Sequence, residues 1–145
     1  MNTLHRLPSL PLFHRALLLD LVTGVPTVVL LIAAAGWAAP LLGLPAGLLR
    51  MAGVVLLPFG ALLALTVRTA KPHRLAAWSI MEINLAWVAA SFWVLYGAGL
   101  APTAMGHVVV IAQALAVLGI AALQFAGWRR LSATHDFSGS VAARA

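Results

Sequence analysis

The sequence contains no cysteine and few charged residues, and each shortage excludes a class of protein. Without cysteine there can be no disulfide, thiolate metal site, CxxC redox pair or cysteine nucleophile. Charged residues make up 8% of the 145 positions, whereas a soluble domain has about 25%. Hydrophobic residues make up 63%, and the mean hydropathy is +1.02. A chain this short cannot bury so much apolar surface in water, so we predict an integral membrane protein.

Catalytic and cofactor-binding patterns are also absent from the sequence. No Walker, GxSxG or HExxH motif occurs. The five histidines show no i, i+4 spacing, so we expect no metal or haem site and no cofactor. The net charge of +6 comes from bases at the ends of apolar runs, which favours contact with lipid headgroups over nucleic acid. We therefore expect a protein that is not an enzyme and whose surroundings are the lipid bilayer.

Four long apolar runs predict an all-α membrane protein with helices at about 12–37, 46–67, 75–96 and 104–128. Each run can cross a hydrocarbon core of about 30 Å, because a helix rises about 1.5 Å per residue. The first run is too long for a signal-peptide core and is interpreted as a retained helix. Short turns make successive helices antiparallel neighbours, so we predict an up-down bundle over residues 12–130. Residues 1–11 and 131–145 are predicted to be tails, the second of them flexible.

The distribution of basic residues predicts the orientation in the membrane. With four crossings, the N-tail, the charged hinge at 68–74 and the C-tail lie on one side. Cytoplasmic loops are rich in Lys and Arg, so we predict that both termini are cytoplasmic and that the membrane is a bacterial inner membrane. The opposite side holds only Arg50. The hinge side holds the other eight bases, Arg6, Arg15, Arg68, Lys71, Arg74, Arg129, Arg130 and Arg144.

Two of the three acidic residues, Asp20 and Glu82, lie inside apolar runs. They stand about 8 Å beyond Arg15 and about 12 Å beyond Arg74 along their helices. An ionisable group at such a depth is costly unless it is paired, protonated or hydrated, so both are candidate functional residues. The alternative is structural, with each acid pairing with Arg15, Arg68 or Arg74 and fastening two helices together. Convergence of the two acids in one cavity would favour a functional role.

Other polar residues extend this pattern. Gln113 and Gln124 are eleven residues apart, about 1100° of turn, so they share a helical face. Thr23, Gly24 and Thr27 form a polar or small stripe beside the first acid. Polar side chains of membrane helices point into the bundle, so a polar seam is possible; a set of separate interhelical hydrogen bonds is the alternative. The candidate intramembrane site comprises Asp20, Glu82, Asn84, Gln113 and Gln124.

Small residues recur on the second predicted helix. Gly53, Gly60 and Ala64 lie at spacings that place them on one face, which allows close backbone approach to a neighbour. This face is predicted to contact a second copy of the chain or another membrane protein. The alternative is that the glycines only reflect the usual composition of membrane helices.

Several segments resemble a family of small four-helix inner-membrane proteins from high-GC bacteria. They are LLGLPAGLLRMAG at 41–53, the Asn84-x-x-Trp87 pair, APTAMG at 101–106, the QALAV run from Gln113, and QFAGWRR at 124–130. The resemblance implies the same fold and location, but that family has no assigned activity, so no catalytic residue is carried over. The chain is also similar to the small multidrug-resistance exporters in size, helix count and an acid in the first helix, without their motifs around that acid.

Of two functional hypotheses, the sequence predicts the first, and the second is its alternative. The first is a non-enzymatic accessory or interaction subunit, which requires the small-residue face to be exposed. The second is a proton-coupled small-molecule transporter that uses the intramembrane acids, which requires a cavity that reaches them. Neither the substrate nor the partner can be named from the sequence.

Overall fold

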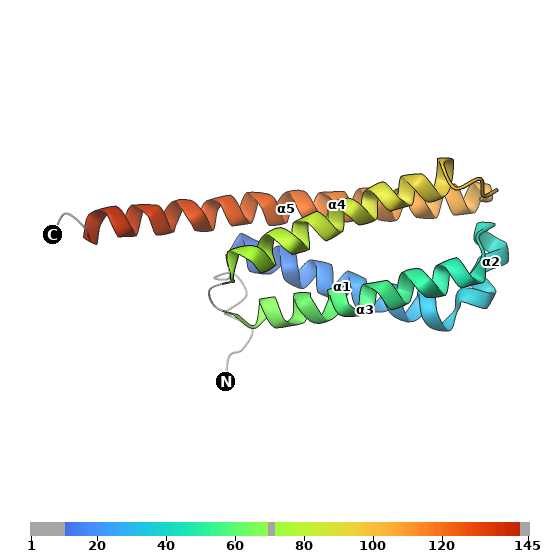
Figure 1. The fold of residues 1–145 in the computed structure, drawn as a ribbon, viewed down its shortest axis with the longest axis horizontal. Helices are drawn as coiled ribbons and strands as arrows, with labels where there is room; N and C mark the ends of the chain where they lie inside the picture. Colours follow the sequence, from blue (N-terminus) through green and yellow to red (C-terminus); the bar gives the residue numbers. More distant parts are fainter. Residues whose placement is uncertain (1–10, 70–71, 143–145) are drawn as a thin grey trace, which may run out of the picture.

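A computed structural model of the chain describes residues 11–69 and 72–142, and in the last helix it describes side chains as far as Ser132. The regular secondary structure of these residues is entirely helical (Figure 1). The helices are α1 Leu12–Ala33, α2 Ala35–Leu42, α3 Ala46–Val67, α4 Arg74–Tyr96 and α5 Ala104–Ala142. All but α2 are long and apolar enough to span a membrane. The predicted all-α fold with four transmembrane helices is confirmed, and the chain has the architecture of a multi-pass membrane protein.

The first helix is shorter than the sequence predicts. Instead of continuing to Trp37, α1 ends at Ala33, because Ala34 leaves helical geometry with φ −104° and ψ 10°. The bend lets Ala35 become fully buried, and the chain then forms α2 in a segment that was predicted in part as an apolar turn. The other long helices begin within one residue of their predicted positions. Pro26 does not interrupt α1.

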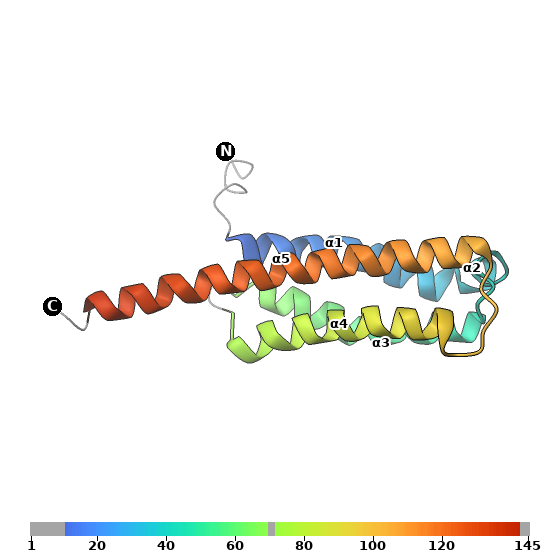
Figure 2. The ribbon, with the colours of Figure 1, turned by 90° about the horizontal axis from the view of Figure 1, so that it is seen from above.

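The last helix is longer than predicted. We expected it to end at Trp128 and residues 131–145 to form a flexible tail. Instead α5 continues to Ala142 and projects well beyond the other helices (Figures 1 and 2). The segment contains no proline after Pro102, so no proline stops the helix after its apolar run. The predicted N-tail at 1–11 lies, apart from Pro11, outside the described residues.

The four long helices surround a central space. α1 packs extensively against both α3 and α5, and α4 packs along α5, whereas α3 and α4 touch only lightly (Figures 1 and 2). The α1–α3 and α4–α5 pairs are antiparallel neighbours, as the short turns predict. We call the end with residues 68–73 the hinge end and the end with α2 and residues 97–103 the turn end. Both ends are tightly packed.

At the hinge end, the core consists of Phe13, Leu17, Leu63, Ala77 and Ile80, each at most 1% exposed. Gly127 of α5 lies directly against the backbone of Phe13, where a Cβ would come within 2.5 Å of the Phe13 nitrogen. The Phe13 ring meets the Trp128 ring edge-on at 5.5 Å between centroids. This packing joins the start of α1 to α5.

At the turn end, the hairpin before α5 is fastened to α2. The Thr103 hydroxyl donates to the Leu41 carbonyl at 2.6 Å, and the Thr103 backbone N–H donates to the Leu42 carbonyl at 3.0 Å. Gly43 ends α2 with φ 65°, and a Cβ there would lie 2.7 Å from the Ala101 carbonyl oxygen. Only glycine fits both the backbone angle and the contact. Ala35, Leu44 and Leu49 form the buried core beside this junction.

One residue of the predicted small-residue face of α3, Gly53, packs against the same chain. Gly53 is buried against α1, where a Cβ would approach Ile32 Cγ1 to 2.7 Å. Gly60 and Ala64 border a cavity inside the bundle. The close backbone approach that this face was expected to offer a second chain is therefore made within the chain at Gly53.

Candidate functional site

The central polar site is a closed triangle of side chains from three helices. Asn84 Nδ2 on α4 donates to Asp20 Oδ2 at 2.7 Å and to Gln124 Oε1 at 3.1 Å. Gln124 Nε2 on α5 donates to Asp20 Oδ2 at 2.6 Å. All three residues are buried: Asp20 is 5% exposed, Asn84 is 3% exposed and Gln124 is 0% exposed. The triangle ties α1, α4 and α5 together at one depth.

Asp20 does not form the arginine pair that was one of its two predicted roles. Arg15, Arg68 and Arg74 are exposed at the hinge end, and within the described part of the chain the Asp20 carboxyl has amide partners only. Asp20 lies five residues beyond Arg15, so its side chain is on the interior face of α1 while Arg15 is on the exterior. The carboxyl is therefore buried beside neutral donors.

The two oxygens of the Asp20 carboxyl differ. Both amide hydrogen bonds from described residues end on Oδ2. Among the described residues, the one buried side-chain polar atom without a hydrogen bond is His14 Nδ1. Oδ1 is thus neither bonded nor sealed from the space that Asp20 lines. A proton or a ligand can be held on Oδ1 without breaking either bond to Oδ2.

Glu82 lies apart from this site. It is exposed on α4, and it stands two residues from Asn84, which is about 200° around a helix. Asn84 faces the interior, so Glu82 must face outward. The two acids do not converge, and of the five predicted site residues Glu82 is the one that the structure leaves outside the bundle. Glu82 lies four residues, about one helical turn, beyond Trp78 of α4.

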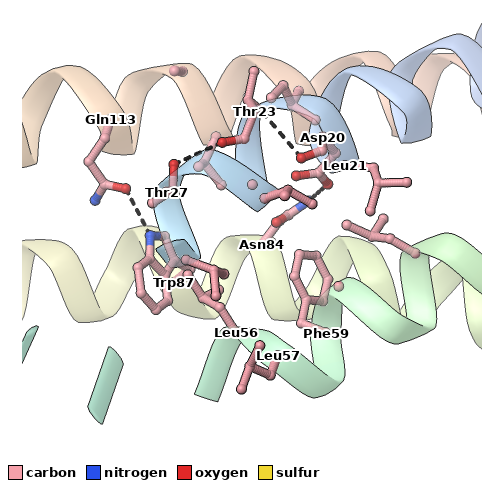
Figure 3. A pocket seen from close by; sticks show the side chains of 18 of the residues that line it. Asp20, Leu21, Thr23, Thr27, Leu56, Leu57, Phe59, Asn84, Trp87 and Gln113 are labelled. Carbon is pink, nitrogen blue, oxygen red and sulfur yellow. Dashed lines mark hydrogen bonds between the residues drawn. The ribbon is translucent and has the colours of Figure 1, made fainter. Parts of the chain in front are cut away.

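A second polar group lies toward the turn end. Trp87 Nε1 donates to Gln113 Oε1 at 2.9 Å (Figure 3), and Gln113 Nε2 donates to Ser91 Oγ at 2.9 Å. The Ser91 hydroxyl donates in turn to the Trp87 carbonyl at 2.8 Å. Gln113 therefore orients the indole ring from α5. Sequence reasoning missed this role of Trp87; its i, i+3 spacing from Asn84 was the available signal, since such residues share a helical face.

A cavity of about 470 Å³ lies between the helices, and Asp20, Asn84, Trp87 and Gln113 are its main polar walls (Figure 3). The rest of the lining is mostly aliphatic. This volume falls within the range of about 300–1,000 Å³ that is typical of small-molecule sites. The polar seam predicted from the sequence thus has four of its five members, Asp20, Asn84, Gln113 and Gln124, in or directly bonded to the wall of one cavity.

Glycines keep this cavity open. A Cβ added at Gly24 of α1 or at Gly60 of α3 would meet no atom within 4 Å, and both residues line the cavity. Thr23 and Thr27 also line it, but their hydroxyls donate to the carbonyls of Leu19 and Thr23 in their own helix, each at 2.8 Å. The predicted small and polar stripe on the first helix is therefore part of the cavity wall.

The cavity opens toward the side of the bundle. Val25, Val29 and Leu57 line it and are yet 54%, 59% and 52% exposed. Val25 lies about 20 Å along an α1 helix of about 33 Å, which is in the middle third of the membrane span. The packed cluster at the hinge end adjoins the cavity through Leu63, and the cluster at the turn end lies beyond its other side. Its mouth therefore faces the hydrocarbon of the bilayer.

No group of three or more His, Asp and Glu side chains that could hold a metal occurs in the part of the chain that the structure describes. No protein-family model, curated protein or solved structure matches the chain. The resemblance to small four-helix membrane proteins therefore stays a prediction. Function has to be inferred from the cavity and its polar groups.

Proposed function

We propose that the protein is a proton-coupled small-molecule transporter of a bacterial inner membrane, and that Asp20 exchanges the proton. The observation that carries the proposal is a carboxyl 5% exposed within a membrane-spanning helix, held by neutral amides and lining a cavity of about 470 Å³. A carboxyl at such a depth is costly, and residues of this kind mark proton and substrate pathways in membrane proteins. The cavity supplies the space that a substrate needs.

The bonding of Asp20 suits proton exchange. The two amides hold Oδ2 in place, while Oδ1 gains or loses the proton at the cavity wall. The three-helix triangle therefore stays intact in both protonation states, and the change in charge falls inside the cavity. A carboxyl paired with an arginine would instead stay ionised, because the base stabilises the charged form.

The proposed orientation places both termini in the cytoplasm. It rests on the bases Arg15, Arg68, Arg74, Arg129 and Arg130 at the hinge end, against Arg50 near the turn end. In that orientation Asp20 lies in the cytoplasmic half of the membrane. The packed hinge and turn ends would then act as the cytoplasmic and outer closures of the cavity.

The test uses the full chain reconstituted in vesicles that contain a pH-sensitive dye. A panel of small amines, carboxylates, sugars and neutral aromatic solutes is added outside, and proton movement is recorded for each. We expect at least one class of solute to drive proton movement, and Asp20→Asn to abolish it. Glu82→Gln is the matched control, because Glu82 is exposed outside the bundle; it should leave the movement unchanged. Equal proton movement in wild type and Asp20→Asn for every solute would exclude the proposal.

A non-enzymatic accessory subunit is the second candidate, and one observation favours it. α5 runs past Arg129 and Arg130 to Ala142, and it projects beyond the other helices (Figure 2). A projecting helix offers a partner an attachment site outside the membrane. Truncation after Ser132 separates the two candidates: it should leave solute-driven proton movement intact if the protein is a transporter.

A further inference from the structure

The polar side chains around the cavity favour a ligand that donates a hydrogen bond. Each side-chain donor that lines it already makes a hydrogen bond within the protein, namely Thr23, Thr27, Asn84, Trp87 and Gln113. Apart from the second N–H of Gln113, what remains is an acceptor, Asp20 Oδ1. A ligand rich in acceptors or carrying a negative charge would find at most the second N–H of Gln113 as a donor and would face a carboxyl. A ligand that donates a hydrogen bond would find its partner.

The indole of Trp87 supplies the second contact. Its N–H edge is held by Gln113 on α5, so the apolar ring is what it presents to the cavity that it lines. Trp87 lies one turn beyond Asn84, the residue that bonds Asp20. The cavity wall thus holds a carboxyl and an aromatic ring, the two groups that stabilise an ammonium in an apolar site.

The lateral opening of the cavity further restricts which chemical class of ligand can enter. Because Val25, Val29 and Leu57 open the cavity to hydrocarbon, a ligand that enters there must first dissolve in the bilayer. A permanent cation does so poorly, since a charge in the hydrocarbon core is costly. A neutral amine does so readily and can become charged only once it reaches an acid.

We propose that the substrate is a lipophilic amine, which enters from the bilayer as the neutral base and is held as an ammonium between Asp20 and Trp87. The transfer is balanced: the O–H bond of the protonated Asp20 carboxyl breaks, and an N–H bond forms on the amine. The cavity gains a carboxylate–ammonium pair but no net charge. This assignment rests on the proposed transport function, because the same carboxyl carries the proton.

The test measures equilibrium binding to the full chain in lipid nanodiscs, with empty nanodiscs to subtract partitioning. The probes are N-methyldibenzylamine, its quaternary N,N-dimethyl analogue, and the uncharged isostere in which CH replaces the nitrogen. We expect saturable binding of the amine, weakened at least about tenfold by Asp20→Asn, since removing one side of a buried charge pair costs that much or more. Trp87→Leu should weaken binding roughly two- to thirtyfold through loss of the cation–π contact. Trp37→Leu should have no effect, because Trp37 is 70% exposed and lies outside the cavity.

A second pair of variants leaves the polar triangle untouched. Gly24→Leu should abolish amine binding by filling the cavity, because a Cβ there meets open space. Gly119→Leu is its control, since Gly119 is an exposed glycine of α5 that also has open space around it but does not line the cavity. Binding that survives Gly24→Leu would overturn the assignment of the site.

The outcomes separate this inference from the transport proposal. Binding of the quaternary analogue as tight as that of the amine would overturn entry as a neutral base. Equal binding of the uncharged isostere, unaffected by Asp20→Asn, would overturn the ammonium pair. If another class of solute drives Asp20-dependent proton movement while the amine does not bind, the substrate class is wrong and transport stands. Amine binding without proton movement would support the site and exclude transport.

Discussion

Gly127 and Gly24 are both glycines of membrane-spanning helices, but their surroundings differ. A Cβ at Gly127 would lie 2.5 Å from the Phe13 backbone nitrogen, whereas a Cβ at Gly24 would meet no atom within 4 Å. The first glycine lets two helices touch at the hinge end, and the second leaves space in the middle. The hinge end is therefore closely packed, whereas the middle of the bundle leaves space that a ligand could fill.

The largest expected effect is at the packed end. Gly127→Leu places a side chain against the backbone of Phe13, which is fully buried and cannot move aside cheaply. We expect destabilisation of about 3 kcal/mol or more, because overpacking a core forces backbone shifts. The thermal unfolding midpoint in detergent, followed by circular dichroism, measures it. A midpoint equal to that of the wild type would mean that α1 and α5 are not in contact there.

A smaller loss is expected where the packed end meets the cavity. Asp20→Ala leaves the amides of Asn84 and Gln124 without the carboxyl that both of them bond. We expect a cost of about 2 kcal/mol, in the range for buried donors left unsatisfied. Asp20→Asn keeps an acceptor oxygen in place and should cost less. If the two variants melt together at the wild-type temperature, the triangle contributes nothing to stability.

The residues of this triangle also show which parts of the site can be predicted from the sequence. Depth along each helix, counted from the flanking arginines, correctly placed Asp20 in the membrane. Depth alone also placed Glu82 in the seam, although its separation of two residues from Asn84 puts it about 200° away. Helical angle would have excluded Glu82 from the interior. Which helices pack side by side could not be counted in this way, because the α1–α5 contact depends on the fit of Gly127 to Phe13.

Helix boundaries were predictable where a chemical signal marks them. Arg68 and the hinge that follows it limit α3, and Gly97 follows the last residue of α4. The bend at Ala34 carries no such signal, since it arises from burying Ala35 in the core of the turn end. The extension of α5 was missed because its polar composition suggested disorder. The polar composition of this segment indicates that it can lie in water. The absence of proline indicates that the helix can continue through it.

A third effect, smaller again, concerns the indole at the far side of the cavity. Gln113→Leu removes the acceptor of the Trp87 N–H and one partner of Ser91. We expect a loss of about 1 kcal/mol in unfolding free energy, typical of one interhelical hydrogen bond in a membrane. The freed indole should also show a shifted fluorescence emission, which Trp87→Phe would remove. An unchanged spectrum would indicate that Gln113 does not hold the ring.

The smallest effect on stability should come from the hollow region itself. Gly24→Leu adds apolar atoms where there is open space, and it replaces glycine by a better helix former, a change of up to about 1 kcal/mol in favour of the helix. We expect the unfolding midpoint to stay the same or rise slightly, although the same substitution at Gly127 should lower it strongly. Gly119→Leu, which also faces open space but lies outside the cavity, gives the effect of helix propensity alone. If Gly24→Leu destabilises the protein as strongly as Gly127→Leu, the middle of the bundle is as closely packed as its ends, and the cavity cannot admit a ligand.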